Sequence, residues 1–192
     1  MPAPAFRADG LAFPRAALSD AFGRAGRAAS APDLMERRMG ITDYLSASDV
    51  ILDLGASNKR TALQLLAAEA ANRLGRPEEE VLEALQARER LGSTALGRGV
   101  ALPHAQIGGN APPVALFARL GRPVDFEARD EEPVDLVILV LWPEASPEGF
   151  LPALSDTCRS LRDEQVRRKL RLARAPAEVL ALLSGPPSGP AT

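Results

Sequence analysis

Apolar positions recur along the chain at two different spacings, and they predict a protein that mixes strands and helices. Short, continuous apolar runs are typical of strands, whereas apolar residues three or four positions apart are typical of one helix face. The predicted strands are 50–54, 100–102, 114–120 and 134–142, and the predicted helices are 58–75, 77–91, 150–161, 164–173 and 176–183. Helices before, strands in the centre and helices after predict an α/β fold: a single-domain mixed β-sheet sandwiched by helices.

Boundary residues sharpen several of these elements. Asn58 or Ser57 is expected to cap the first helix, and Gly75 to close it. Pro77 suits the first turn of the next helix and is followed by three glutamates, which favour the positive end of a helix dipole. The run at 134–142 is nearly all apolar, which predicts a central strand covered on both faces.

The two ends of the chain differ from its middle. Residues 1–38 are rich in Ala, Arg, Pro and Gly without an apolar period, so we predict a disordered N-terminal extension. An organelle transit peptide and a start codon assigned too early remain open alternatives, because Met39 opens the well-patterned segment. The domain is predicted to span 39–184, and the Gly-, Pro- and Ser-rich residues 185–192 to form a flexible tail.

Composition narrows the class of protein. Lys and Arg total 23 against 25 for Asp and Glu, so the net charge of −2 argues against a broad nucleic-acid-binding surface. No apolar run approaches the roughly 18–20 residues that a membrane span needs, and we expect a soluble cytoplasmic protein. The one cysteine, Cys158, has no partner for an intramolecular disulfide and is expected to be a small buried apolar residue.

The segment 88–104 carries the candidate chemistry. Gly97 and Gly99 bracket a predicted turn, a short strand follows, and Pro103 fixes its own φ immediately before the single histidine of the chain. His104 is therefore expected at a strand end near the surface. A neutral imidazole there, with an unperturbed pKa of about 6.5, is a competent nucleophile.

Polar groups nearby suit an anion. Ser93 and Thr94 offer hydroxyls, and Arg88 and Arg98 offer guanidinium donors, as the transfer of a phosphoryl group requires. The residues alone leave a structural role open, because a lone histidine beside a proline is often merely structural or exposed. The segment lacks the pattern of a nucleotide-binding phosphate loop. A hydrolase or metalloenzyme would need a triad or further ligands that the sequence does not offer.

The same segment, REx3STx2GxGVALPH, resembles the active-site motif of the IIA domains of the bacterial phosphotransferase system, mannitol/fructose type. It is most similar to the nitrogen-regulatory branch, enzyme IIA-Ntr. Four further segments resemble other parts of these domains, and the resemblance covers about residues 39–183. They are 40–45, 56–59, 123–126 and 133–136.

This resemblance implies a function and a site. His104 would accept a phosphoryl group on an imidazole nitrogen, Arg88 would neutralise the phosphate, and Thr94 or Ser93 would hydrogen-bond it. Arg98 falls at a variable position and is interpreted as a solvated loop residue. The donor would be the phosphocarrier HPr or its nitrogen-branch counterpart NPr, and transporters or sensor kinases would read the phosphorylation state. The chain would be a phosphocarrier without cofactor or metal rather than a stand-alone turnover enzyme.

Two positions depart from the family pattern. Phe150 stands where family members usually carry a second histidine, and Gln106 lies in the segment where a Lys or Arg commonly follows the active histidine. Both changes remove a donor from the expected phosphate environment, although Phe150 also fits a core-facing helix residue. Two alternatives therefore stay open: a sugar-specific IIA component that passes phosphate to a IIB cysteine, and a diverged binding module that is not phosphorylated.

Overall fold

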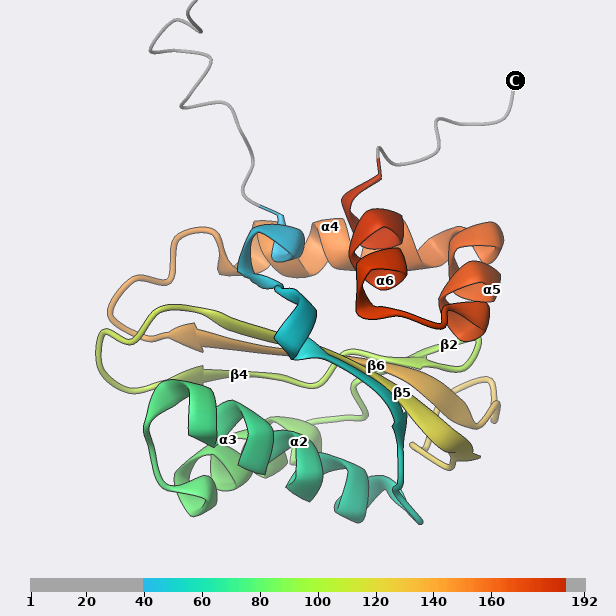
Figure 1. Ribbon diagram of the computed structural model, residues 1–192. Coiled ribbons are helices and arrows are strands. Elements are labelled where there is room, and N and C mark those ends of the chain that lie inside the picture. Colours follow the sequence, from blue (N-terminus) through green and yellow to red (C-terminus); the bar gives the residue numbers. More distant parts are fainter. Residues whose placement is uncertain (1–39, 186–192) are drawn as a thin grey trace, which may run out of the picture. The chain divides into compact units, whose positions relative to one another are not determined.

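The computed structural model describes residues 40–185, which form one mixed sheet with helices on both faces (Figure 1). The predicted α/β sandwich is confirmed. The predicted N-terminal extension, and the predicted tail except for Gly185, lie outside the described residues. Within 40–185, no helix has the length and apolar content to cross a membrane.

The sheet is organised around one long strand, β6. Its neighbours are the antiparallel β5 on one side and, on the other, the short parallel strands β3 and β4, which lie one after the other along it. Beyond them, β1 runs parallel to β5, and β2 pairs antiparallel with β3. The strands are β1 Val50–Leu54, β2 Ala95–Gly97, β3 Val100–Ala101, β4 His104–Ile107, β5 Val114–Val124 and β6 Val134–Pro143.

Two helical layers cover the sheet (Figure 1). One face carries α2 and α3; the other carries α4, α5 and α6 together with two short 3₁₀ turns, η1 and η2. As predicted, Asn58 caps α2 by accepting from the backbone N–H of Thr61, and Gly75 ends it with a φ of 63°. The helices are α2 Lys59–Leu74, α3 Glu78–Arg90, α4 Phe150–Arg162, α5 Glu164–Leu172 and α6 Pro176–Ser184, with η1 Ile41–Tyr44 and η2 Ala47–Asp49.

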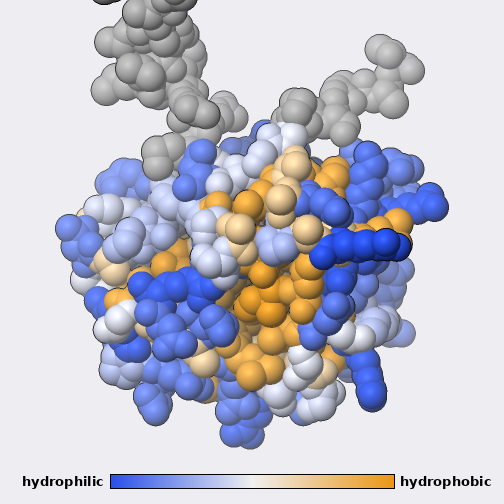
Figure 2. Space-filling model, in the orientation of Figure 1, coloured by the Kyte–Doolittle hydropathy of each residue, from blue (hydrophilic) through white to orange (hydrophobic). Residues whose placement is uncertain are grey.

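Each face of the sheet has its own apolar core. Leu66 of α2 and Val81 of α3 pack with alternate residues of the sheet in one core, and Leu170 and Val179 do so in the other. Residues of β6 contribute to both cores in alternation, which confirms the prediction of a strand covered on both faces. On the molecular face where β1 forms the sheet edge, Figure 2 shows an apolar band between hydrophilic areas.

The region of His104 differs from the prediction in one respect. His104 was expected at the end of a strand, but it begins a further strand, β4. Pro103 has no N–H, yet its carbonyl accepts from the backbone N–H of Val140 at 2.9 Å, so the chain stays paired with β6 across the proline. His104 is consequently half-buried at the start of a paired strand.

Candidate functional site

His104 is held by the backbone on one side of its ring. Its Nδ1 lies 2.8 Å from the carbonyl oxygen of Leu102, the residue that links β3 to the proline. A carbonyl oxygen only accepts, so Nδ1 carries the proton in this contact and donates it. The other nitrogen, Nε2, is then the one with a free lone pair, which makes it the nucleophilic atom of the ring.

Arg88 approaches that nitrogen from the last turn of α3. Its Nε–H donates to Nε2 of His104 at 2.9 Å, and its Nη1 donates to the carbonyl of Gly92 at 3.0 Å. A cation in the last helical turn is favoured by the helix dipole, and this second bond fixes the guanidinium over the turn that follows α3. The structure therefore brings together two of the predicted site residues, His104 and Arg88.

The surroundings of His104 keep its imidazole neutral. Burial is the largest influence and lowers the pKa of His104, and the positive charge of Arg88 lowers it further. The hydrogen bond to Leu102 and the carboxylate of Glu89 act in the opposite direction, but the pKa remains below its ordinary value. At neutral pH the ring is thus mainly an uncharged base, and the lone pair of its Nε2 accepts the hydrogen bond from Arg88.

Aromatic rings close the other side of the site. The ring of Phe150, the first residue of α4, meets His104 edge-on with the centroids 6.0 Å apart. Phe150 also packs against Trp142 at 5.8 Å, and Trp142 contacts Tyr44 at 5.2 Å. Phe150 is therefore both a core-facing residue, as predicted, and a direct neighbour of the candidate nucleophile.

The two hydroxyl residues lie in different environments. Ser93 donates its hydroxyl proton to the carbonyl of Phe126 at 2.6 Å and accepts from the N–H of Ala95, so its hydrogen-bonding capacity is largely used. Thr94 is buried, and its Oγ1 has no hydrogen-bond partner within the described residues. Its carbonyl accepts from the N–H of Leu102, which ties Thr94 to the segment that leads to His104.

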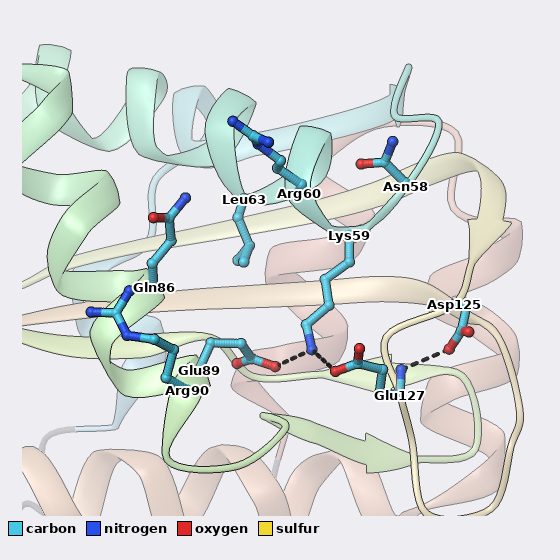
Figure 3. Close-up of a pocket in the computed structure, with 9 residues that line it drawn as sticks. All are labelled: Asn58, Lys59, Arg60, Leu63, Gln86, Glu89, Arg90, Asp125 and Glu127. Atoms are coloured by element: carbon cyan, nitrogen blue, oxygen red, sulfur yellow. Dashed lines mark hydrogen bonds and ion pairs between the residues drawn. The ribbon is translucent and has the colours of Figure 1, made fainter.

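An ionic network next to this site was not predicted as functional. Glu89 follows Arg88 on α3, and its carboxylate pairs with Lys59 at 2.7 Å while it accepts from the N–H of Thr94. Lys59 also reaches Glu127 at 2.9 Å, and Figure 3 shows these groups together in a cavity of about 640 Å³. Burial alone would raise the pKa of Glu89, but the hydrogen bonds from Lys59 and Thr94 outweigh it and lower that pKa overall. Lys59 and Glu89 both lie in segments that resemble the family, and this resemblance was the one sequence signal that could have indicated a functional role for them.

The site offers no arrangement for a metal. Within residues 40–185, no group of three or more His, Cys, Asp or Glu side chains is placed to hold an ion. What the site offers is a neutral imidazole beside a guanidinium, which suits the transfer of an anionic group.

Comparison with known proteins agrees with this chemistry. Residues 43–185 match the model of the family described as "Phosphoenolpyruvate-dependent sugar phosphotransferase system, EIIA 2". The chain belongs to this family. The predicted resemblance to type-2 IIA domains is thereby confirmed.

Relatives within the EIIA 2 family point to its nitrogen-regulatory branch. A nitrogen regulatory protein of Bradyrhizobium diazoefficiens is 43% identical over 150 residues, which span 78% of this chain and 98% of that protein. The crystal structure of nitrogen regulatory protein IIA-Ntr from Neisseria meningitidis superposes with a TM-score of 0.72 at 32% identity, over 75% of this chain and 99% of that one. Mannitol IIA of Escherichia coli gives a TM-score of 0.62 at 26% identity, over 73% and 99%. The chain is accordingly an EIIA 2 phosphocarrier of the nitrogen-regulatory type.

Proposed function

We propose that His104 accepts a phosphoryl group from a protein donor on its Nε2 atom, and that HPr or NPr is this donor. The observation that carries the proposal is the pair of contacts on the ring: Leu102 holds Nδ1–H, and Arg88 lies against the free nitrogen. Together they orient a neutral nucleophile and place a cation where three phosphoryl oxygens arrive.

The transfer balances without loss of a proton from His104. The Nε2 lone pair forms the new N–P bond while the N–P bond of the donor phosphohistidine breaks. The donor, whose other ring nitrogen is protonated, leaves as a neutral imidazole, and the ring of His104 becomes cationic. His104 keeps its Nδ1 proton, which stays hydrogen-bonded to Leu102. Arg88 exchanges its hydrogen bond with Nε2 for bonds to the phosphoryl oxygens, which are stronger because both partners are charged.

Thr94 is proposed as a second hydrogen-bonding residue of the phosphorylated form. Its buried hydroxyl has no partner among residues 40–185, and a buried hydroxyl without a partner is unfavourable. A small rearrangement of the segment around Thr94 on phosphorylation would give this group an acceptor. Ser93 is the weaker candidate because its proton already serves the carbonyl of Phe126.

Exposed leucines near the site support a protein donor rather than a small molecule. Leu91, three residues after Arg88, is 85% exposed, and Leu151, next to Phe150, is 73% exposed. Exposed apolar side chains that lie together are typical of surfaces that bind other proteins, and we propose that these two leucines belong to such a surface. We expect the donor to contact these leucines, and so should the transporters or sensor kinases that respond to the phosphorylation of His104. These interactions would take place in the cytoplasm.

Phosphorylation in a purified system tests the proposal. The protein is incubated with phosphoenolpyruvate, enzyme I and the phosphocarrier, and we expect acid-labile phosphate on the wild type and none on His104→Ala. An Arg90→Gln variant is the matched control, because Arg90 is exposed and neighbours the site without contacting His104 in the structure. If the wild-type protein stays unlabelled, the proposal is wrong, and the remaining interpretation is a binding module that is not phosphorylated.

The sugar-specific alternative is separated by a second acceptor. Labelled protein is mixed with a fructose- or mannitol-specific IIB protein, and transfer of the label to the IIB cysteine is followed over time. A nitrogen-regulatory carrier is expected to keep its phosphate for much longer than a mannitol IIA domain does in the same assay. Equally rapid transfer by the two proteins would favour the sugar-specific function.

A further inference from the structure

A second cavity lies away from His104, between the β2–β3 turn and the C-terminal half of α4. It has a volume of about 340 Å³. Phe150, which contacts His104, begins α4, whereas Cys158 in the cavity wall lies eight residues further on, or about 12 Å along a helix. The lining residues are Leu96, Gly97, Arg98, Val100, Cys158, Leu161 and Arg162.

The turn beside this cavity holds an arginine in an unfavourable conformation. Arg98 and Gly99 are its two central residues, with φ values of 58° and 75°, a geometry that normally selects Asn, Asp or Gly at the first position. The backbone of Arg98 is clamped there: its N–H donates to Asp130 at 2.7 Å, and its carbonyl accepts from Arg171 at 2.9 Å. A strained residue that its neighbours hold in place is a recurrent feature of binding sites.

Positive charge is concentrated around the cavity. Among residues 40–185, neither Arg98 nor Arg162 has a carboxylate within ion-pair distance, and the one hydrogen bond of the Arg98 side chain is a 3.5 Å bond to the carbonyl of Arg162. Arg167, which is 5% exposed, donates to the carbonyls of Leu161 and Arg162 and so adds a buried charge behind them. Burial, and then the charges of Arg98 and Arg171, lower the pKa of Arg167.

Two acidic groups near the turn are already engaged by other donors. Asp135 is engaged by Arg171 through two bonds of 2.7 and 2.8 Å. Asp130 is exposed, and its carboxylate accepts the backbone N–H groups of Arg98 and Glu132. The cavity is therefore lined by two arginines, Arg98 and Arg162, together with apolar residues that include Val100 and Leu161, which are 2% and 3% exposed.

We propose that this cavity binds a small organic anion, a phosphate or carboxylate with a short apolar body. Guanidinium groups bind both kinds of anion through paired hydrogen bonds, and the apolar floor would cover the body of the ligand. The volume lies at the lower end of the range for small-molecule sites and is too small for a folded partner. The site is independent of the phosphoryl transfer proposed for His104.

Cys158 provides a direct test, because it is the one cysteine of the chain and lines the cavity. The rate of its modification by N-ethylmaleimide is measured on the full chain with phenyl phosphate or benzoate as the probe. At about ten times its Kd, a ligand that covers the thiol is expected to slow the reaction about tenfold. Stronger protection by phenyl phosphate assigns a phosphate ligand, and stronger protection by benzoate assigns a carboxylate.

Charge and shape are separated by controls. Benzyl alcohol, which has the apolar body without the charge, is expected to protect poorly, and so is inorganic phosphate. The double variant Arg98→Gln/Arg162→Gln should lose the protection, whereas Arg159→Gln should keep it, because Arg159 lies on the same helix but pairs with Asp156 outside the cavity. Each rate is compared with that of the same variant without ligand, and thermal unfolding verifies that every variant is folded.

Three results would overturn the proposal. They are no protection by either anion up to about 10 mM, equal protection by benzyl alcohol, and protection that persists in the double variant. Backbone amide shifts of Leu96 and Val100 in the presence of phenyl phosphate give a second measurement that does not depend on the thiol.

Discussion

Arg88 and His104 are joined nitrogen to nitrogen: the Nε–H of the arginine donates to Nε2 of the imidazole at 2.9 Å. The guanidinium thus occupies the direction along which phosphorus would approach the ring. In the unphosphorylated protein this bond holds the ring and lowers the pKa of His104. On phosphorylation the guanidinium has to leave this position, because the phosphorus atom takes its place at Nε2. It can then donate hydrogen bonds to the phosphoryl oxygens.

Replacing Arg88 should slow phosphorylation more than it destabilises the fold. Arg88→Gln removes the cation that compensates the phosphoryl charge, and we expect the rate of phosphoryl acceptance to fall about 10²-fold, as when one donor to a developing charge is removed. Arg88→Lys keeps the charge but loses the planar fork, so an intermediate rate is expected. Stopped acid-labile labelling at early times measures both rates.

The same variants also report on His104 itself. With the positive charge of Arg88 removed, the pKa of His104 should rise, and an NMR titration of the imidazole measures this rise. Arg90→Gln should change neither quantity. If Arg88→Gln is phosphorylated at the wild-type rate, Arg88 has no role in the transfer.

The pH dependence of the site follows from the neutral state of His104. Its pKa is lowered in the folded protein, so its neutral form predominates at pH 7, and the rate of phosphorylation should fall as pH drops through the folded pKa. The unfolded chain takes up its proton nearer pH 6.5, so the unfolded state binds more protons between the two values. The contribution of His104 to stability is therefore complete above about pH 6.5 and is lost as pH falls towards the folded pKa.

Two measurements check this behaviour. Nitrogen-15 NMR of the imidazole should show Nδ1 protonated and Nε2 bare at neutral pH, because Leu102 accepts from Nδ1. Urea unfolding between about pH 5 and pH 7 should show a smaller loss of stability for His104→Gln than for the wild type. A wild-type pKa at or above 6.5 would contradict the prediction.

The Lys59–Glu89 pair should stabilise the segment that carries Ser93 and Thr94. Glu89→Gln replaces a carboxylate that accepts from Lys59 and from the N–H of Thr94, and we expect a loss of about 1–3 kcal/mol in the free energy of unfolding. Because the pKa of Glu89 is lowered, its contribution is present above about pH 4.5 and is lost as pH falls through the folded pKa. Urea unfolding at pH 7 and pH 4 measures both effects.

A double-mutant cycle separates the pair from its surroundings. Lys59→Met also loses the bond to Glu127, so the coupling energy between Lys59 and Glu89 is obtained only when the double variant is included. Glu83→Gln is the matched control, since Glu83 is exposed on the same helix and has no ion pair within residues 40–185. A coupling energy near zero would mean that the network does not hold the segment.

The sequence predicted most of the fold because its elements carry local signals. Asn58 and Gly75 mark both ends of α2, and the apolar run of β6 marks the centre of the sheet. The strand β4 was missed because its four residues follow a proline, and its pairing depends on β6, some thirty-six positions away along the chain, through His104 and Val140. Such a partner leaves no trace in local periodicity.

The candidate site divides in the same way. The motif marked His104 and Arg88, and the structure places them in direct contact. The use of the Ser93 proton by the carbonyl of Phe126 was not predictable, because that carbonyl lies thirty-three residues away in a loop. The sequence motif therefore identified the residues of the site, whereas long-range contacts determined which of their atoms are already used in hydrogen bonds.

Restoring a histidine at position 150 should strengthen the phosphorylated form. The ring of Phe150 already lies 6.0 Å from that of His104, so Phe150→His places a nitrogen donor beside the acceptor without moving the backbone. A charge-assisted hydrogen bond contributes roughly 1.5–3 kcal/mol, so the half-life of the phosphohistidine, or the rate of its formation, is expected to rise about tenfold. Labelling and chase experiments on the purified protein measure both quantities.

Phe150→Leu, which removes the ring contact with Trp142 and adds no donor, separates the new hydrogen bond from the loss of packing. Equal half-lives and rates for the histidine and leucine variants would show that position 150 acts through packing alone.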